Sequence, residues 1–304
     1  MSYILQFLVI CLLVVLGCAK VTVQGQASRK FIRCTPDSVL FNAQLFLVIA
    51  VVMAVVFPLG GIGWGGVLLA AGAALGTFLF QTCYALALKC GPVSLTVLIV
   101  NFSVLFSTVF SILAYNEKIF LTQLFGIAFL LASMFLSVKK EDGEKGVSKK
   151  WVVLALTAML TNSGAAILMK IFVKTLSAEF ENSQNTFVVL MYIIASAMAF
   201  GYYFLGTVTD KKEKNTYGFF NKFAWLYALI IGVVLGIYQK FYMLGMEQID
   251  GAFMFPTYAG MQSLGMTVIG ILLFKDRLSI RQKIGIACGI VCVVLMNIRL
   301  VELF

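Results

Sequence analysis

Long apolar runs separated by short polar breaks cover almost the whole chain. An α-helix needs about 20 mostly apolar residues to cross the hydrocarbon core of a bilayer. The runs are too long for membrane β-strands, which span with about 10 residues, and they show no strict alternation. Because a helix pairs its own backbone polar groups, which lipid cannot solvate, we predict an all-α polytopic membrane protein. About ten transmembrane helices are expected, over Tyr3–Val23, Val39–Pro58, Gly65–Leu88, Val93–Tyr115, Ile119–Val138, Trp151–Val173, Thr186–Leu205, Phe223–Met246, Ala252–Phe274 and Ser279–Ile298.

Composition agrees with this class and changes how the charge is interpreted. Hydrophobic residues make up 61% of the 304 residues, and charged residues only 12%, which is about half the share in soluble domains. The net charge of +10 does not indicate a nucleic-acid partner, because the basic residues stand at the ends of apolar runs and form no basic stripe. We therefore expect the lipid bilayer as the surrounding partner, in the plasma (inner) membrane of a bacterium, and no nucleic acid.

The cysteines and the lack of histidine argue against a disulfide framework or a metal site. Cys288 and Cys292 share a helix face, but small apolar packing is their expected role. No cofactor and no metal are expected. The first segment resembles a lipoprotein signal that would end before Cys18. It lacks a positively charged start, and Leu16 is bulky for such a cleavage site, so we interpret it as the first span.

A polar stretch at Lys139–Lys150 divides the chain into two halves, residues 1–145 and 146–304, which share a pattern of polar residues. Across three successive segments, each matching residue of the second half follows its counterpart in the first half by 158 or 159 positions. Since each half has five spans, an odd number, the second copy has to lie inverted in the membrane, as in many secondary transporters. The matching residues are Gln81, Tyr84, Glu117, Lys118, Gln123 and Gly126 in the first half and Gln239, Tyr242, Asp276, Arg277, Gln282 and Gly285 in the second.

At these residues the sequence resembles the drug/metabolite transporter superfamily, in its ten-helix EamA-like form. The resemblance rests on an acidic-basic pair in the short loop before the fifth and tenth helices, and on Pro256 in the ninth. The family's tryptophan-glycine signature in the first helix is absent. The resemblance implies the family fold but no particular substrate, because the family moves amino acids, sugars, nucleotide precursors and drugs. The two stretches that carry it are YALALKCGPVSLTVLIVNFSVLFSTVFSILAYNEKIFLTQLFGIAFLLAS and YMLGMEQIDGAFMFPTYAGMQSLGMTVIGILLFKDRLSIRQKIGIACGIV.

The candidate substrate site is uncharged. Every acidic residue falls in a loop or at the end of a segment, which argues against a buried-carboxylate proton antiporter and against an intramembrane hydrolase. Glutamine and tyrosine three residues apart share one helix face, and this pair occurs once in each half. The two faces could converge on a cavity, or they could hold helices together by hydrogen bonds. The candidate substrate-binding residues are Gln81, Tyr84, Gln239 and Tyr242, with Asn101, Asn162, Tyr258 and Gln262 as further cavity candidates.

Lys170 is the strong charge that falls well within a predicted span. Its long side chain could extend to the membrane surface, or it could attract an anionic substrate. We count it among the candidate substrate-binding residues. Glycines four apart, such as Gly72 with Gly76 and Gly232 with Gly236, indicate close contact between helices.

The sequence thus predicts a secondary transporter or exporter of small polar or amphipathic metabolites or drugs, working by alternating access with a small-molecule substrate. It is not expected to be an enzyme, because no acid–base cluster lies within the spans. A flippase for a lipid-linked intermediate and a non-transporting membrane assembly subunit are the alternatives. The substrate, direction, coupling ion and oligomeric state are left open by the sequence.

The orientation of the chain is predicted differently by charge and by resemblance. Alternate loops fall on the same side of the membrane, and one side collects 18 of the 23 basic residues, Lys20 among them. Positive loops stay in the cytoplasm, which places both termini outside. The family resemblance suggests both termini inside. The charge bias is large, so we predict termini outside.

Overall fold

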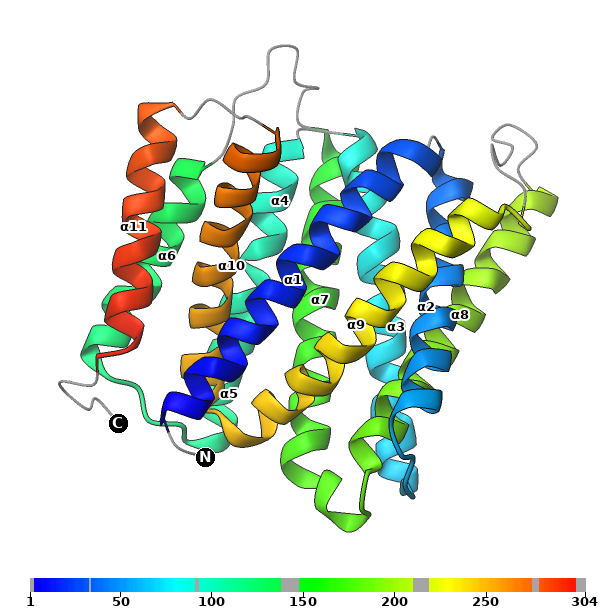
Figure 1. Ribbon diagram of the computed structural model, residues 1–304, viewed down its shortest axis with the longest axis horizontal. Helices are drawn as coiled ribbons and strands as arrows, with labels where there is room; N and C mark the ends of the chain where they lie inside the picture. The colour runs from blue at the N-terminus through cyan, green and yellow to red at the C-terminus, as the bar shows by residue number, and fades with distance from the viewer. Residues whose placement is uncertain are drawn as a thin grey trace.

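The computed structural model describes residues 3–32, 34–90, 93–137, 148–209, 219–274 and 279–298. These residues form a bundle of long helices that stand side by side (Figure 1). In chain order the helices are α1 (Tyr3–Phe31), α2 (Thr35–Val56), α3 (Trp64–Cys90), α4 (Val93–Asn101), α5 (Ser103–Tyr115), α6 (Leu121–Ser137), α7 (Lys149–Thr175), the short η1 (Ser177–Glu179), α8 (Ser183–Thr209), α9 (Lys222–Gln248), α10 (Gly251–Phe274) and α11 (Ile280–Met296).

Ten spans account for these helices, because α4 and α5 are two parts of one. The helix is interrupted at Phe102, but a single apolar stretch, Thr96–Tyr115, covers both parts. Seven stretches of the described helices are long and apolar enough to cross a membrane by themselves. The prediction of an all-α polytopic membrane protein is confirmed. The boundaries differ by a few residues, and the largest difference is in α1, which continues to Phe31 and not only to Val23.

The two halves run in opposite directions through the bundle. We call the end of the bundle where α1 begins and α11 ends the lower face, and the other end the upper face (Figure 1). The helix α1 rises from the lower to the upper face, whereas α7, the first helix of the second half, descends from the upper to the lower. The second half is therefore inverted, as the odd number of spans requires.

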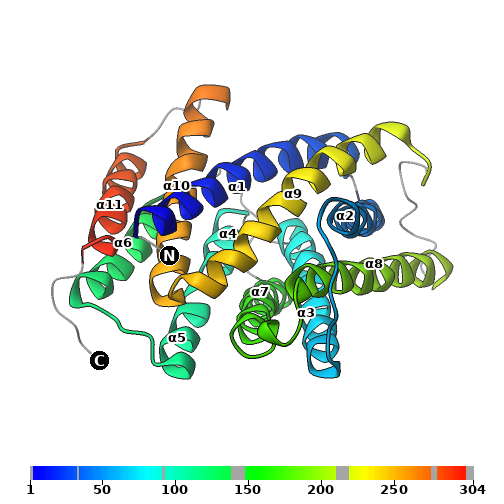
Figure 2. The same cartoon turned by 60° about the horizontal axis from the view of Figure 1, so that its bottom comes forward.

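The contacts between helices also reflect the repeat, because a contact made by a helix of one half is made again by its counterpart in the other half. The helix α1 packs against α9, and its counterpart α7 packs against α3. Likewise α2 lies against α9, and α8 lies against α3. The equivalent helices α2 and α8 pack on each other, as do α6 and α11 (Figure 2). This exchange of partners is what a twofold relation in the membrane plane between the halves produces.

The repeated glutamines have a local structural role. Gln123 accepts a hydrogen bond from the Phe120 backbone N–H at 3.2 Å, and Gln282 accepts one from the Ser279 N–H at 3.1 Å. Each side chain therefore satisfies a backbone donor at the start of α6 or α11, where no carbonyl is available within the helix. The predicted match of Glu117 with Asp276 lies outside the described residues.

The glycine pairs bring helices into close contact, as predicted. A Cβ placed on Gly76 of α3 would lie 3.1 Å from the Ala165 Cβ of α7. A Cβ on Gly236 of α9 would lie 3.1 Å from Val52 Cγ1 of α2. Larger residues at these positions would push the helices apart. The glycines thus fix the packing of the helices that surround the centre of the bundle.

Candidate functional site

A cavity of about 800 Å³ lies between the two halves. Residues from every long helix except α2 line it, so it belongs to both repeats. Its walls combine amide and hydroxyl groups with aromatic rings. The aromatic residues that line it are Phe80, Tyr84, Tyr192, Tyr238, Tyr242, Phe255 and Tyr258.

Eight of the nine predicted site residues line this cavity. The inverted arrangement places the two glutamine–tyrosine faces at different depths, with the α3 pair nearer the upper face and the α9 pair nearer the lower. Lining the cavity is a matter of geometry, and substrate binding by these residues stays a prediction. The eight are Gln81, Tyr84, Asn101, Asn162, Gln239, Tyr242, Tyr258 and Gln262.

Side-chain contacts order the lower part of the cavity. The rings of Tyr238 and Tyr242 stack with centroids 5.4 Å apart, and Tyr258 lies 6.1 Å from Tyr238. The Gln239 amide nitrogen lies 3.3 Å from Met169 Sδ, and its oxygen faces the Tyr192 hydroxyl at 3.5 Å. Gln239 is therefore both a wall residue and a link between helices, which combines the two roles that the sequence left open.

The middle of the cavity contains a further polar contact between the halves. Asn162 of α7 donates a hydrogen bond to the Ser103 hydroxyl of α5 at 2.8 Å. Ser103 is the first residue after the interruption at Phe102, so the break in this span places a hydroxyl on the cavity wall. The two predicted candidates Gln81 and Asn101 line the same cavity.

Lys20 is a cavity residue that the sequence reasoning missed. The charge count assigns it to a loop, although Lys20 falls within the predicted first span, Tyr3–Val23. Since α1 continues to Phe31, Lys20 lies inside the helix and lines the cavity. Among the described lining residues it is the only charged one. The signal that could have found it is its position within this apolar span, because Ile4–Gln24 contains the lysine.

Lys170, the ninth candidate, does not line the cavity in this structure, and its contact with substrate stays a prediction. Its Nζ lies 3.0 Å from Glu117 Oε1 and donates a hydrogen bond to the Ile249 carbonyl at 3.2 Å. The Lys170 side chain is 1% exposed, so it does not extend to the membrane surface either. The lysine is directed at a carboxylate because Glu117, although it stands in a loop, is buried by the helix ends around it.

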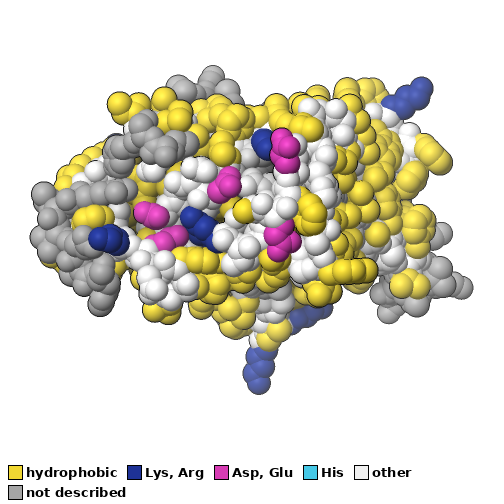
Figure 3. Space-filling model, turned by 90° about the horizontal axis from the view of Figure 1, so that it is seen from below, with side chains coloured by type: hydrophobic (Ala, Val, Ile, Leu, Met, Phe, Trp, Pro, Cys, Tyr) yellow, Lys and Arg dark blue, Asp and Glu magenta, His cyan; other side chains and the backbone are white. Residues whose placement is uncertain are grey.

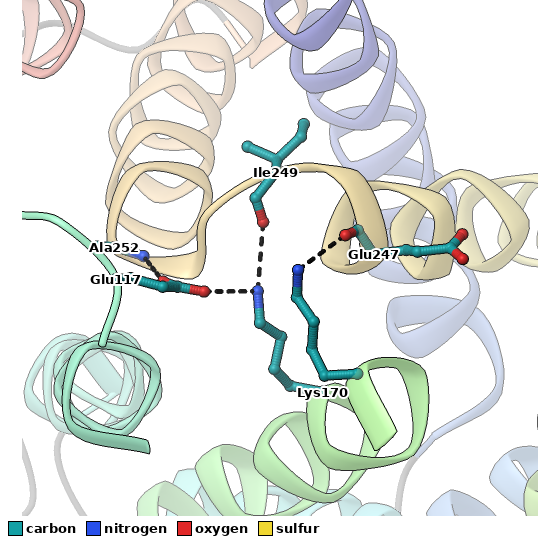
Figure 4. Close-up of polar contacts among 6 residues, drawn as sticks. Glu117, Lys170, Glu247, Ile249 and Ala252 are labelled. Atoms are coloured by element: carbon teal, nitrogen blue, oxygen red, sulfur yellow. Dashed lines mark hydrogen bonds and ion pairs between the residues drawn. The ribbon is translucent and has the colours of Figure 1, made fainter. Parts of the chain in front are cut away.

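This ion pair is part of a network just below the cavity (Figure 4). The other carboxylate oxygen of Glu117 accepts a hydrogen bond from the Ala252 backbone N–H at 2.8 Å, at the start of α10. One turn further along α7, Lys174 donates to the Glu247 carbonyl at 2.8 Å. The turn between α9 and α10 is thereby attached to α7 and to the loop before α6.

The network joins the two halves at the lower face. Glu117 belongs to the first half, whereas Lys170 and Ala252 belong to the second. Figure 3 shows acidic and basic side chains gathered at the centre of this face, surrounded by apolar ones. A second link lies beside it, where the Gly60 N–H donates to the Thr186 hydroxyl at 2.9 Å. The lower face is therefore held together by polar contacts between the halves.

The cavity reaches the upper part of the bundle but stops above this network. Its upper limit includes Gln282 in the first turn of α11, and its lower limit includes Met169, which directly precedes Lys170. The upper and lower limits of the cavity are thus built from different residues. A large cavity between inverted halves, with one side closed, is an arrangement typical of membrane transporters.

The comparisons with known proteins identify the family. The model of the EamA-like transporter family matches residues 8–139 and again residues 149–298, and the chain belongs to this family. It is therefore a membrane transporter of the drug/metabolite type. The fold is similar to a crystal structure whose description names no function, with a TM-score of 0.74 and 15% sequence identity. The match covers 97% of this chain and 96% of the other chain. At this identity the likeness shows the fold alone. No curated protein matches the chain.

Proposed function

We propose that the protein is a secondary transporter or exporter that moves small polar or amphipathic metabolites or drugs across the plasma membrane by alternating access. The observation that carries this proposal is the cavity of about 800 Å³ between the inverted halves. Cavities of roughly 300–1,000 Å³ bind ligands the size of metabolites and drugs. Its position at the interface of the repeats is where secondary transporters hold their substrate.

The chemistry of the walls supports an amphipathic solute. The stacked rings of Tyr238 and Tyr242 offer a flat apolar surface near the floor. Amide groups from Gln81, Asn101 and Gln262 offer hydrogen-bond donors and acceptors higher up. A solute with an apolar body and a polar group can satisfy both sets of contacts, whereas water alone would leave the apolar surface unfavourably exposed.

Alternating access requires the lower face to open when the upper side closes. In inverted repeats this happens when one half rocks against the other, so contacts between the halves at the closed side have to break. The Glu117–Lys170 ion pair and the Gly60–Thr186 hydrogen bonds are such contacts. Their polar character favours reversibility, because water can replace each partner once the face opens.

We propose that transport is passive, driven by exchange of solutes, or coupled to an ion that is bound by neutral ligands. No acidic side chain is among the described residues that line the cavity. Glu117 is buried, but its charge is matched by Lys170, and the pair lies below the cavity. A carboxylate that carries protons together with substrate would have to be reachable from the cavity.

A thermal-shift screen of the purified protein against metabolite classes, followed by counterflow in liposomes, tests the proposal. We expect at least one solute to stabilise the protein and to exchange across the membrane. Gln81→Ala and Gln239→Ala should slow this exchange, because both side chains line the cavity. Gln248→Ala at the exposed end of α9 is the matched control. Exchange that is absent for every stabilising solute, or equal in all three variants, would contradict the proposal.

A further inference from the structure

Lys20 stands inside the membrane-spanning part of α1. The apolar span Ile4–Gln24 contains it, and about three helical turns separate it from the end of α1 at Phe31. A charged side chain at such a depth is costly in lipid and marks a functional position by default. Lys20 reduces this cost by lining the cavity, which water can fill.

The charge of Lys20 has no counterpart among the residues that the structure describes. In the described structure its ammonium group forms no ion pair and no hydrogen bond, and no acidic residue shares the cavity wall. Lys170 shows the opposite arrangement, since its ammonium group is matched by Glu117 and by a backbone carbonyl. The fold thus neutralises one intramembrane lysine and leaves the other directed at the cavity.

Neutral polar groups accompany Lys20. The helix α1 packs along α10, where Gln262 and Ser263 line the same cavity. Gly17, three residues before Lys20 and so on the same face of α1, is close to this wall, because a Cβ placed there would lie 3.0 Å from the Gln262 amide nitrogen. An ammonium group beside amide and hydroxyl donors is a chemical environment that stabilises an anion by charge-assisted hydrogen bonds.

We infer that the transported solute carries an anionic group, a carboxylate or a phosphate, and that Lys20 binds this group within the cavity. The inference rests on the proposed transport function and names its substrate class. The apolar part of the solute packs against the tyrosine rings nearer the floor, where Tyr238 and Tyr242 stack. Amphipathic anions are therefore selected over amines of the same shape, because a cation would meet the uncompensated charge of Lys20.

Four probes with one ring and different charges test the inference. They are phenylacetate, phenyl phosphate, phenylacetamide and phenethylammonium, titrated against the detergent-purified full chain with the melting temperature as readout. We expect one or both anions to bind more tightly than the neutral amide, and the amine to bind most weakly. The advantage of the anion over the amide should be about tenfold or more, as expected for a charge-assisted contact.

Single-residue variants test whether Lys20 is responsible for the preference for anions. Lys20→Gln should abolish the preference for anions, Lys20→Arg should keep most of it, and Lys222→Gln at the exposed start of α9 should leave it unchanged. Because Lys20 has no partner in the described structure, Lys20→Gln should melt at the same temperature as the unsubstituted protein or higher. Anions that bind no better than the amide, or a preference that survives in Lys20→Gln, would overturn the inference. So would stabilisation by short-chain phosphatidylglycerol alone, since the anion would then be a lipid headgroup.

Counterflow of the bound anion separates this inference from the proposed function. An anion that binds through Lys20 but does not exchange across liposomes would support the anion site and contradict transport. Exchange of a neutral solute at the same rate in Lys20→Gln and in the unsubstituted protein would support transport and contradict the anion site. Exchange of an anion that is lost in Lys20→Gln supports both.

Discussion

The Lys170 ammonium lies 3.0 Å from the Glu117 carboxylate, and this pair joins the two halves of the protein beneath the cavity. The lysine is 1% and the glutamate 5% exposed, so water does not screen either charge. A buried ion pair is by itself weak evidence for stability, because taking both groups out of water is costly. Removing only one partner is strongly destabilising, since the other charge then stays buried without compensation.

Replacing one member of this pair should destabilise the protein more than replacing both. We expect Glu117→Gln or Lys170→Gln to lower the free energy of unfolding by about 3–5 kcal/mol. The double variant should lose less than the sum of the two single losses, because neither charge is left unpaired. Unfolding in detergent measures this, with Lys222→Gln as a control for an exposed lysine. Additive losses would show that the two charges do not interact.

Gly60 should not tolerate a methyl group at the lower face. A Cβ at this position would overlap the Glu181 carbonyl oxygen, which belongs to the backbone and cannot move aside alone. We expect Gly60→Ala to cost about 1–3 kcal/mol, as overpacking does. Hydrogen exchange should rise in residues 58–63 and 179–186, where the Gly60–Thr186 hydrogen bonds would be lost.

Gly201 in α8 provides the matched control for this substitution. In the described part of the chain, apart from the neighbouring residues and backbone of its own helix, no heavy atom lies within 4 Å of a Cβ placed there. Since alanine favours helix over glycine by up to about 1 kcal/mol, Gly201→Ala should leave stability unchanged or raise it. Equal losses in the two variants would indicate a general effect of alanine and not the contact with Glu181.

The repeat residues show how far the sequence could predict this fold. Long apolar runs specify helices in lipid, because no other local structure pairs the backbone there, and so the ten spans follow from sequence. Gln123 and Gln282 match between the halves because each caps a helix start, which is a local interaction with a fixed spacing. Local chemistry of this kind is visible along a chain, and it located both the halves and their inversion.

The network under the cavity could not be predicted in the same way. Glu117 and Lys170 stand on different halves, and nothing in the neighbouring residues indicates that they meet. Their contact depends on how α7 packs against the turn before α10, which is a long-range property of the fold. The position of Lys20 on the cavity wall is likewise a long-range property, because it depends on how α1 packs against α9 and α10.

Transport should not require a proton gradient. The described cavity wall contains no carboxylate that could carry a proton with the solute. We expect counterflow of a stabilising solute in liposomes to continue when the internal and external pH are equal and a protonophore is present. Strict dependence on an imposed gradient, abolished by neutralising one acidic residue, would contradict this expectation. Glu117→Gln is the variant to include, since Glu117 is the buried carboxylate nearest the cavity floor.

Both termini should lie outside the cytoplasm. The first helix, α1, begins and the last, α11, ends at the lower face, whereas α6 ends and α7 begins at the upper face (Figure 1). Finding Lys20 in the cavity removes one residue from the loop count of 18 among 23, and the bias remains large. Because positive loops stay in the cytoplasm, the upper face is expected there, and the cavity would then be reached from the cytoplasm.

A reporter that is active only in the cytoplasm decides this orientation. Fused after Phe304 it should be inactive, and inserted within residues 139–150 it should be active. The second fusion controls for expression, since both variants contain the same reporter and the same ten spans. Strong activity after Phe304, with none in the linker, would reverse the assignment. The cavity would then be reached from outside the cell, and the network of Glu117 and Lys170 would close the cytoplasmic side.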